Sequence, residues 1–209
     1  MASQVEIANR ALSKLGEARI TSVSDNNPEA KAVSARWDTL RDAALTENPW
    51  RFAIELVQLV ADSTAPTHGY SYRYRRPSDD LWTVQVGDYA AVYHSLGVLY
   101  RYSTAYDPIS SPYEVVGQYI HTDLSAPLNY QYVKRVENTG EWDALFVEAF
   151  ACRLAMDMCE ELTQSASKMD RVAAMYKDAM KQAVRRNALL RPPQERSTGK
   201  WFGARVAHG

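Results

Sequence analysis

Apolar residues recur every three or four positions at both ends of the chain and alternate in short runs between them. Near the start, a Ser3-x-x-Glu6 capping box precedes a helical apolar stripe, and Gly16 stands where a left-handed residue can end a helix. The pattern therefore predicts a first helix over residues 4–15. Asn27 before Pro28 marks the start of a second helix, which must end before Pro49.

Helical spacing returns in the last third of the sequence. The stretch EWDALFVEAFACRLAMDMCEELT predicts a long buried helix over about 141–163. Ser167 with Asp170 predicts a cap for a fourth helix, which runs to about Leu190 and is stopped by Pro192 and Pro193.

The residue composition and apolar pattern change between residues 53 and 136, where 12 of the 13 tyrosines and five of the nine prolines occur. Short aromatic and β-branched runs between Gly, Pro and Asp turns predict an antiparallel β-domain. The predicted fold class is therefore α+β, a four-helix bundle of N- and C-terminal helix pairs, interrupted by the β-domain and followed by an extended C-terminal arm. The expected domains are 1–52 and 138–191 for the two bundle halves, 53–137 for the β-domain and 192–209 for the arm.

Composition and charge place the chain among proteins with a sizeable core. Of its 209 residues 46% are apolar, no run is long enough to span a membrane, and the start does not resemble a signal peptide. We therefore expect it to be made and kept in a cytoplasm. The net charge of −1 divides into about +5 for residues 185–209 and −6 for the rest, so a basic tail follows an acidic body.

Catalytic chemistry is not apparent in the sequence. Cys152 and Cys159 are roughly 10 Å apart on one helix, too far for a disulfide, and are expected in the core. Asp79 and Asp80 follow Pro77-Ser78 and are expected to be turn residues that bond the local backbone. The sequence shows no nucleotide-binding or hydrolase motif and predicts no catalytic, metal or cofactor site.

The run YRYRR at residues 72–76 interleaves aromatic and cationic side chains, as single-strand nucleic-acid platforms do. On a strand, however, Tyr72 and Tyr74 share one face while Arg73 and Arg75 share the other. The simpler prediction is that the tyrosines are buried and the arginines exposed.

Four stretches in order, ANRALSKLGEARITSVSDNNPEA, RDAALTENPWRFA, YRYRRPSDDLWTV and LNYQYVKRV followed by EWDALFVEAFACRLA, resemble the head-to-tail adaptor of short-tailed bacteriophages. This is the tail tubular protein A family, also called gatekeeper or tail accessory factor, and the resemblance spans about residues 3–185. It implies a structural virion protein, made in the host bacterial cytoplasm and located in the tail at the head-tail junction.

The resemblance also implies partners. Such adaptors assemble as a homo-oligomeric, twelvefold ring between the portal protein and a nozzle similar to tail tubular protein B. Genomic double-stranded DNA passes through the channel, without sequence specificity, during packaging and ejection. No membrane partner is expected, and the family has no catalytic residues to transfer to this chain.

The tail RPPQERSTGKWFGARVAHG lacks a core of its own, and Trp and Arg are common anchors of interfaces. We expect it to be a portal-binding arm in which two aromatics fill apolar pockets and the cations meet acidic rims. The candidate residues are Arg191, Arg196, Lys200, Trp201, Phe202 and Arg205. The alternative is a tail that is disordered or folded back on its own helices.

Three other functions remain open at this stage. The first is a connector or head-completion ring protein of a long-tailed phage. The second is a tail-associated cell-wall hydrolase, which would need two facing carboxylates or a metal cluster. The third is a nucleic-acid-binding module, whose DNA affinity would depend steeply on salt.

Overall fold

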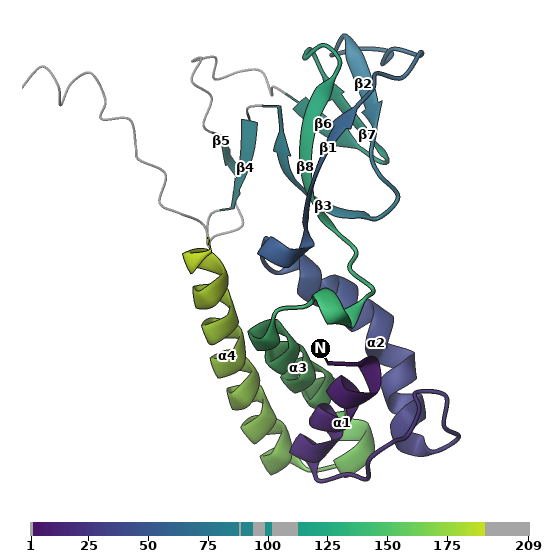
Figure 1. Cartoon of the computed structure of the whole chain (residues 1–209), viewed down its shortest axis with the longest axis vertical. Coiled ribbons are helices and arrows are strands. Elements are labelled where there is room, and N and C mark those ends of the chain that lie inside the picture. Colours follow the sequence, from purple (N-terminus) through teal and green to yellow (C-terminus); the bar gives the residue numbers. More distant parts are fainter. Residues whose placement is uncertain (1, 88, 94–98, 102–112, 191–209) are drawn as a thin grey trace, which may run out of the picture.

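Four helices and eight strands make up the described part of the chain (Figure 1). The structure is a computed structural model that describes residues 2–87, 89–93, 99–101 and 113–190, with only the backbone described for 89–93 and 99–101. All six candidate arm residues, from Arg191 to Arg205, lie outside these described residues. The α+β class is confirmed, with two helices before the strands and two after them.

The two N-terminal helices begin and end as their capping residues predict. Helix α1 (Gln4–Leu15) has the Ser3 capping box, and Gly16 ends it with a φ of 77°. Helix α2 (Pro28–Thr46) begins after Asn27, whose side chain accepts a hydrogen bond from the Ala30 amide at 2.8 Å. A short 3₁₀ turn, η1 (Arg51–Ala53), then leads into the strands.

The two C-terminal helices start at different residues from those expected. A 3₁₀ turn, η2 (Thr139–Glu141), precedes α3 (Ala144–Thr163), which Asp143 caps. Helix α4 (Ala166–Leu189) begins after Ser165, whose hydroxyl accepts from the Lys168 amide. The predicted cap at Ser167 is therefore wrong, because the helix already begins one residue before it.

All pairings between the described strands are antiparallel. The five-stranded sheet has the order β1-β8-β3-β4-β5 and the three-stranded sheet the order β2-β7-β6. The strand bounds are β1 (Ile54–Leu59), β2 (Tyr72–Arg75), β3 (Asp80–Val86), β4 (Tyr89–Tyr93), β5 (Leu99–Arg101), β6 (Tyr113–Val116), β7 (Tyr119–Thr122) and β8 (Leu128–Lys134). The first and last strands are neighbours, so the chain leaves the helices and returns to them on adjacent strands.

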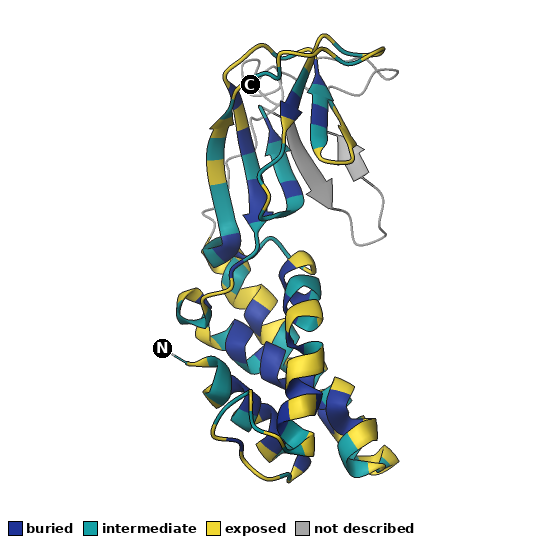
Figure 2. Ribbon diagram, turned by 90° about the vertical axis from the view of Figure 1, so that its right-hand side faces the viewer, coloured by how far each residue is buried: buried dark blue, intermediate teal, exposed yellow. Residues whose placement is uncertain are grey.

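Helix α3 lies at the centre of the helical part and packs against α1, α2 and α4 (Figure 1). Ten of its residues are buried, and they lie around most of the helix rather than along one stripe. Because α1 and α2 come before the strands and α3 after them, the helical core joins segments that are distant in sequence. Figure 2 shows the buried positions turned towards this centre.

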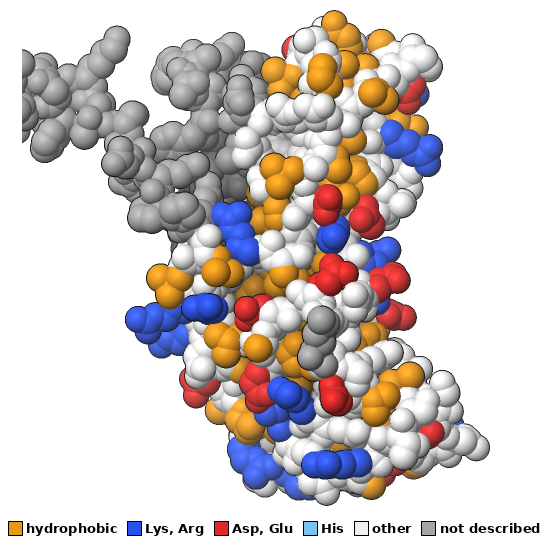
Figure 3. Space-filling model, in the orientation of Figure 1, with side chains coloured by type: hydrophobic (Ala, Val, Ile, Leu, Met, Phe, Trp, Pro, Cys, Tyr) orange, Lys and Arg blue, Asp and Glu red, His pale blue; other side chains and the backbone are white. Residues whose placement is uncertain are grey.

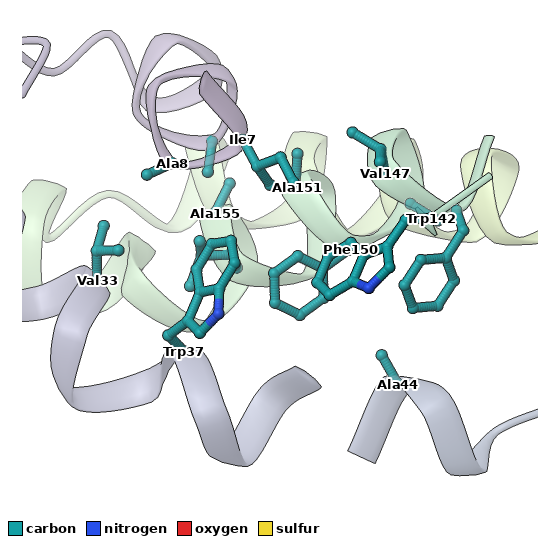
Figure 4. Close-up of a cluster of buried hydrophobic side chains, with 14 of the residues drawn as sticks. Ile7, Ala8, Val33, Trp37, Ala44, Trp142, Val147, Phe150, Ala151 and Ala155 are labelled. Carbon is teal, nitrogen blue, oxygen red and sulfur yellow. The ribbon is translucent and has the colours of Figure 1, made fainter. Parts of the chain in front are cut away.

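Aromatic rings fill the middle of that core. Trp37 of α2 stacks on Trp142 with ring centroids 6.1 Å apart, and Phe150 meets both rings edge-on at 5.0 and 5.1 Å (Figure 4). The Trp142 indole donates to the Val136 carbonyl, so its buried N–H is satisfied. The core continues into the base of the sheet through Val133.

A second, smaller core lies among the strands. Tyr74, Ile120 and Tyr130 are fully or almost fully buried there. The prediction for the YRYRR run is only half right, because Tyr74 is buried while Tyr72 is 38% exposed. Arg73 is half-buried rather than exposed, since it pairs with Asp62 and lies over the Tyr119 ring.

Candidate interaction surfaces

Charged side chains join the N- and C-terminal helices across the strand insertion. Arg36 of α2 binds two carboxylates of α3, those of Asp157 at 2.8 Å and Glu161 at 2.6 Å. From α4, Lys168 and Arg171 donate to carbonyl oxygens in the last turn of α1. These contacts place cations at the negative end of the α1 dipole and fix α4 beside it.

One three-residue cluster joins three helices. Glu47, at the end of α2, pairs with Arg153 of α3 and accepts a hydrogen bond from the Tyr176 hydroxyl of α4 at 2.8 Å. Burial and the hydrogen bond to Glu47 raise the pKa of Tyr176 to about 12. The phenol is therefore held as a donor throughout the neutral range.

Asp79 and Asp80 are structural residues of the sheet and do not behave as predicted. The Asp80 carboxylate is only 1% exposed and accepts hydrogen bonds from Arg76 at 2.8 Å and from the Tyr130 hydroxyl. Asp79 accepts from the Tyr132 hydroxyl at 3.1 Å. Both carboxylates bind side chains rather than the local backbone, because β8 brings the two tyrosines beside them.

The contacts of Asp79 and Asp80 argue against an acid/base role for their carboxylates. Burial, followed by the hydrogen bond to Asp80, raises the pKa of Tyr130 well above its usual range. Asp80 is enclosed and bonded to two partners, so a substrate could not reach its carboxylate. Cys152 and Cys159 are buried free thiols, as the sequence predicts.

The described residues contain neither a candidate metal cluster nor a helix suited to cross a membrane. No group of three or more His, Cys, Asp and Glu side chains there could hold a metal ion. None of the helices described combines the length and the apolar character needed to cross a membrane.

The root of the predicted arm is held firmly in the described structure. Asn187, near the end of α4, donates to the Pro49 carbonyl at 3.0 Å and accepts from the Arg51 amide at 2.8 Å. Beside it, a cleft of about 160 Å³ is lined by Trp50, Phe52 and Leu190, among others. Asn187 therefore fixes where the chain leaves α4, a role that its place on a helix surface does not reveal in the sequence.

The outer face of α4 is exposed along most of its length. Only Val172 and Ala183 of this helix are buried. Four exposed cations on it make no ion pair with any carboxylate that the structure describes: Lys177, Lys181, Arg185 and Arg186. Figure 3 shows Lys and Arg side chains recurring along this edge of the helical part.

A scan of the sequence against protein-family models gives no match, and a search of curated proteins gives none either.

Proposed function

We propose that this chain is a structural virion protein, the head-to-tail adaptor of a short-tailed bacteriophage. In this proposal, copies of the chain form a ring between the portal and the tail nozzle and provide part of the channel for DNA retention and ejection. The observation that carries it is the arrangement of the molecule. A helical part and a β part lie at opposite ends of an elongated chain, and such a shape suits two different neighbours (Figure 1).

The finer architecture belongs to this proposal as well. We treat the four helices as one bundle that acts as a rigid unit towards the portal, with the strands turned towards the nozzle. The charged contacts of α3 and α4 with α1 and α2 support this view, because they tie both ends of the chain together. A hydrolase has less support, since the adjacent carboxylates of Asp79 and Asp80 are engaged in the sheet.

The C-terminal arm is the proposed portal contact. It starts at the firmly held end of α4, beside two exposed leucines, Leu189 and Leu190, which are 73% and 51% exposed. In the proposal Trp201 and Phe202 enter apolar pockets of the portal, while Arg191, Arg196, Lys200 and Arg205 meet acidic side chains. Burial of aromatic anchors would supply most of the affinity, and the cations would orient the encounter.

Deletion of residues 192–209 tests this contact. We expect the shortened chain to keep its circular dichroism spectrum and unfolding midpoint but to lose binding to the portal protein of the same phage. Replacing Trp201 and Phe202 together with alanine should weaken binding at least tenfold, whereas Ser197→Ala should leave it unchanged. Portal binding that survives the deletion would show that the arm is not the contact.

A further inference from the structure

The cations of α4 form a regular row on the side of the helix that faces away from α3. Lys177, Lys181 and Arg185 are four residues apart, so they lie on one face at steps of about 6 Å. These cations are exposed and pair with none of the carboxylates that the structure describes, so they are available to a partner. We call Lys177, Lys181 and Arg185 the α4 basic row.

The same side of α4 also carries groups that a nucleic acid would not favour. Asp170 and Asp178 are exposed on the helix and would repel phosphates. Val184 is 36% exposed and Leu189 73% exposed, and these apolar side chains gain from burial against protein rather than against a phosphate backbone. The surface therefore fits a protein partner that presents carboxylates.

A matching surface lies on α2, at the opposite edge of the helical part. Figure 1 shows α4 and α2 as the two outer helices with α1 and α3 between them. Asp38 projects from α2 with its side chain 80% exposed. Asp42 follows it four residues later, but its side chain is only 27% exposed and pairs with both Arg41 and Arg135. Arg41, the partner of Asp38, has its side chain only 8% exposed, so an approaching surface meets the Asp38 carboxylate rather than the Arg41 guanidinium.

Small side chains beside Asp38 allow another helix to approach closely. Ala35 and Thr39 are exposed next to it on α2. When two helices lie side by side, a cation of the α4 basic row on one copy can therefore reach the exposed Asp38 carboxylate on the other.

We propose that the α4 basic row of one copy packs against the Asp38 face of α2 on the next copy. The two surfaces differ and lie on opposite edges, so the contact is heterologous and repeats from copy to copy until the assembly closes. This inference rests on the proposed ring and names the surfaces by which neighbouring copies meet. The arm and the strands remain available for other partners.

Cysteine cross-linking tests the contact in the full chain, with and without portal. A variant with both Asp38→Cys and Lys181→Cys should give a ladder of covalent oligomers on treatment with a short bismaleimide. Either substitution alone should give no ladder. The pair Ser63→Cys with Lys181→Cys is the matched control, because Ser63 is exposed but lies in the loop after β1.

A charge exchange tests the pairing directly. Asp38→Lys alone and Lys181→Asp alone should each lose assembly, because like charges then face each other across every contact. An equal mixture of the two variants should recover it, since alternating copies restore an opposite pair at each interface. Lys181→Asp should unfold at the same midpoint as the unsubstituted chain, because Lys181 is exposed and pairs with no described carboxylate. Asp38→Lys removes a partner of the nearly buried Arg41, so its midpoint should be lower, and circular dichroism checks that it is folded before assembly is measured.

Three outcomes would overturn the inference, and they can be told apart. Multi-copy particles without the Asp38–Lys181 ladder, or without recovery in the mixture, would leave the ring standing and place its contacts elsewhere. Loss of salt-sensitive DNA binding in Lys181→Asp, with assembly unchanged, would assign the α4 basic row to phosphates. Absence of any multi-copy particle, even with portal, would remove both the inference and the proposed function.

Discussion

The hydroxyls of Tyr130 and Tyr176 bind carboxylates of residues that are far away in the sequence. Asp80 is reached by Tyr130, 50 positions later, and Glu47 by Tyr176, 129 positions later. The local sequence around Asp79 and Asp80 indicates a turn, and nothing in it shows that β8 will bring two tyrosines beside them. The turn itself was predictable, whereas the partners of its side chains depend on strand pairing.

Stability at high pH should report on these tyrosines. Burial raises the pKa of Tyr130 and Tyr132 above the ordinary value of 10.0, and the pKa of Tyr176 rises to about 12. A raised pKa in the folded state means that this stability is complete below pH 10 and is lost as the pH rises through the folded values. We expect the free energy of unfolding in urea to fall steadily above pH 10.

The variant Tyr176→Phe isolates the contribution of this one phenol to the pH dependence of the free energy of unfolding. It should lower stability at pH 9 and make the decline between pH 10 and 12 shallower, because one raised phenol has been removed. Tyr72→Phe is the control, since Tyr72 is partly exposed. An identical pH profile for Tyr176→Phe and the unsubstituted chain would contradict the assigned environment.

Helices were more predictable than sheets in this chain, because their signals are local. The Ser3 capping box, the Asn27 cap and Gly16 all act within four residues, and they fix α1 and the start of α2. The start of α4 was misplaced because Ser165 and Ser167 both offer capping hydroxyls. Gln164 takes a left-handed conformation with a φ of 48°, which ends α3 and leaves Ser165 as the first available cap.

The strands show the limit of local signals. Alternation and tyrosine content predict strands between residues 53 and 136, but they do not reveal that β1 pairs with β8 or that β3 pairs with β8 across two irregularities. The α4 basic row was missed for a different reason. Unpaired cations on a helix are indistinguishable in sequence from an ordinary solvated face until the paired residues are known.

The variant Phe150→Ala tests whether packing around α3 stabilises the helical part of the molecule. Phe150 is 1% exposed and touches Trp37 and Trp142, so its loss leaves a cavity between α2 and α3. We expect a decrease in the free energy of unfolding of about 3–5 kcal/mol. Leu189→Ala, at a position that is 73% exposed, should change it by less than about 0.5 kcal/mol.

Two spectroscopic probes of unfolding, tryptophan fluorescence and helical circular dichroism, should respond equally to Phe150→Ala. If α3 holds both halves of the helical part, tryptophan fluorescence and helical circular dichroism will shift to the same lower midpoint in Phe150→Ala. Separate transitions for the two probes would indicate that the N- and C-terminal helices unfold independently.

At the scale of the whole molecule, the helices, the strands and the end of α4 present three separate regions. The helical part gathers both ends of the described chain around α3, the strands extend away from it, and Asn187 fixes the root of the predicted arm. The arm itself was predicted from composition, because two prolines, several cations and two aromatics follow a helix without any periodic pattern.

Particle mass, measured by native mass spectrometry or mass photometry with and without the portal protein, tests the central claim most directly. The account predicts a portal-dependent particle that contains a ring of copies, with a mass contribution near twelve times the 23.6 kDa of one chain. A single copy in free solution is compatible with it, if the portal acts as the template. A chain that stays monomeric and unbound when mixed with its portal would contradict the account.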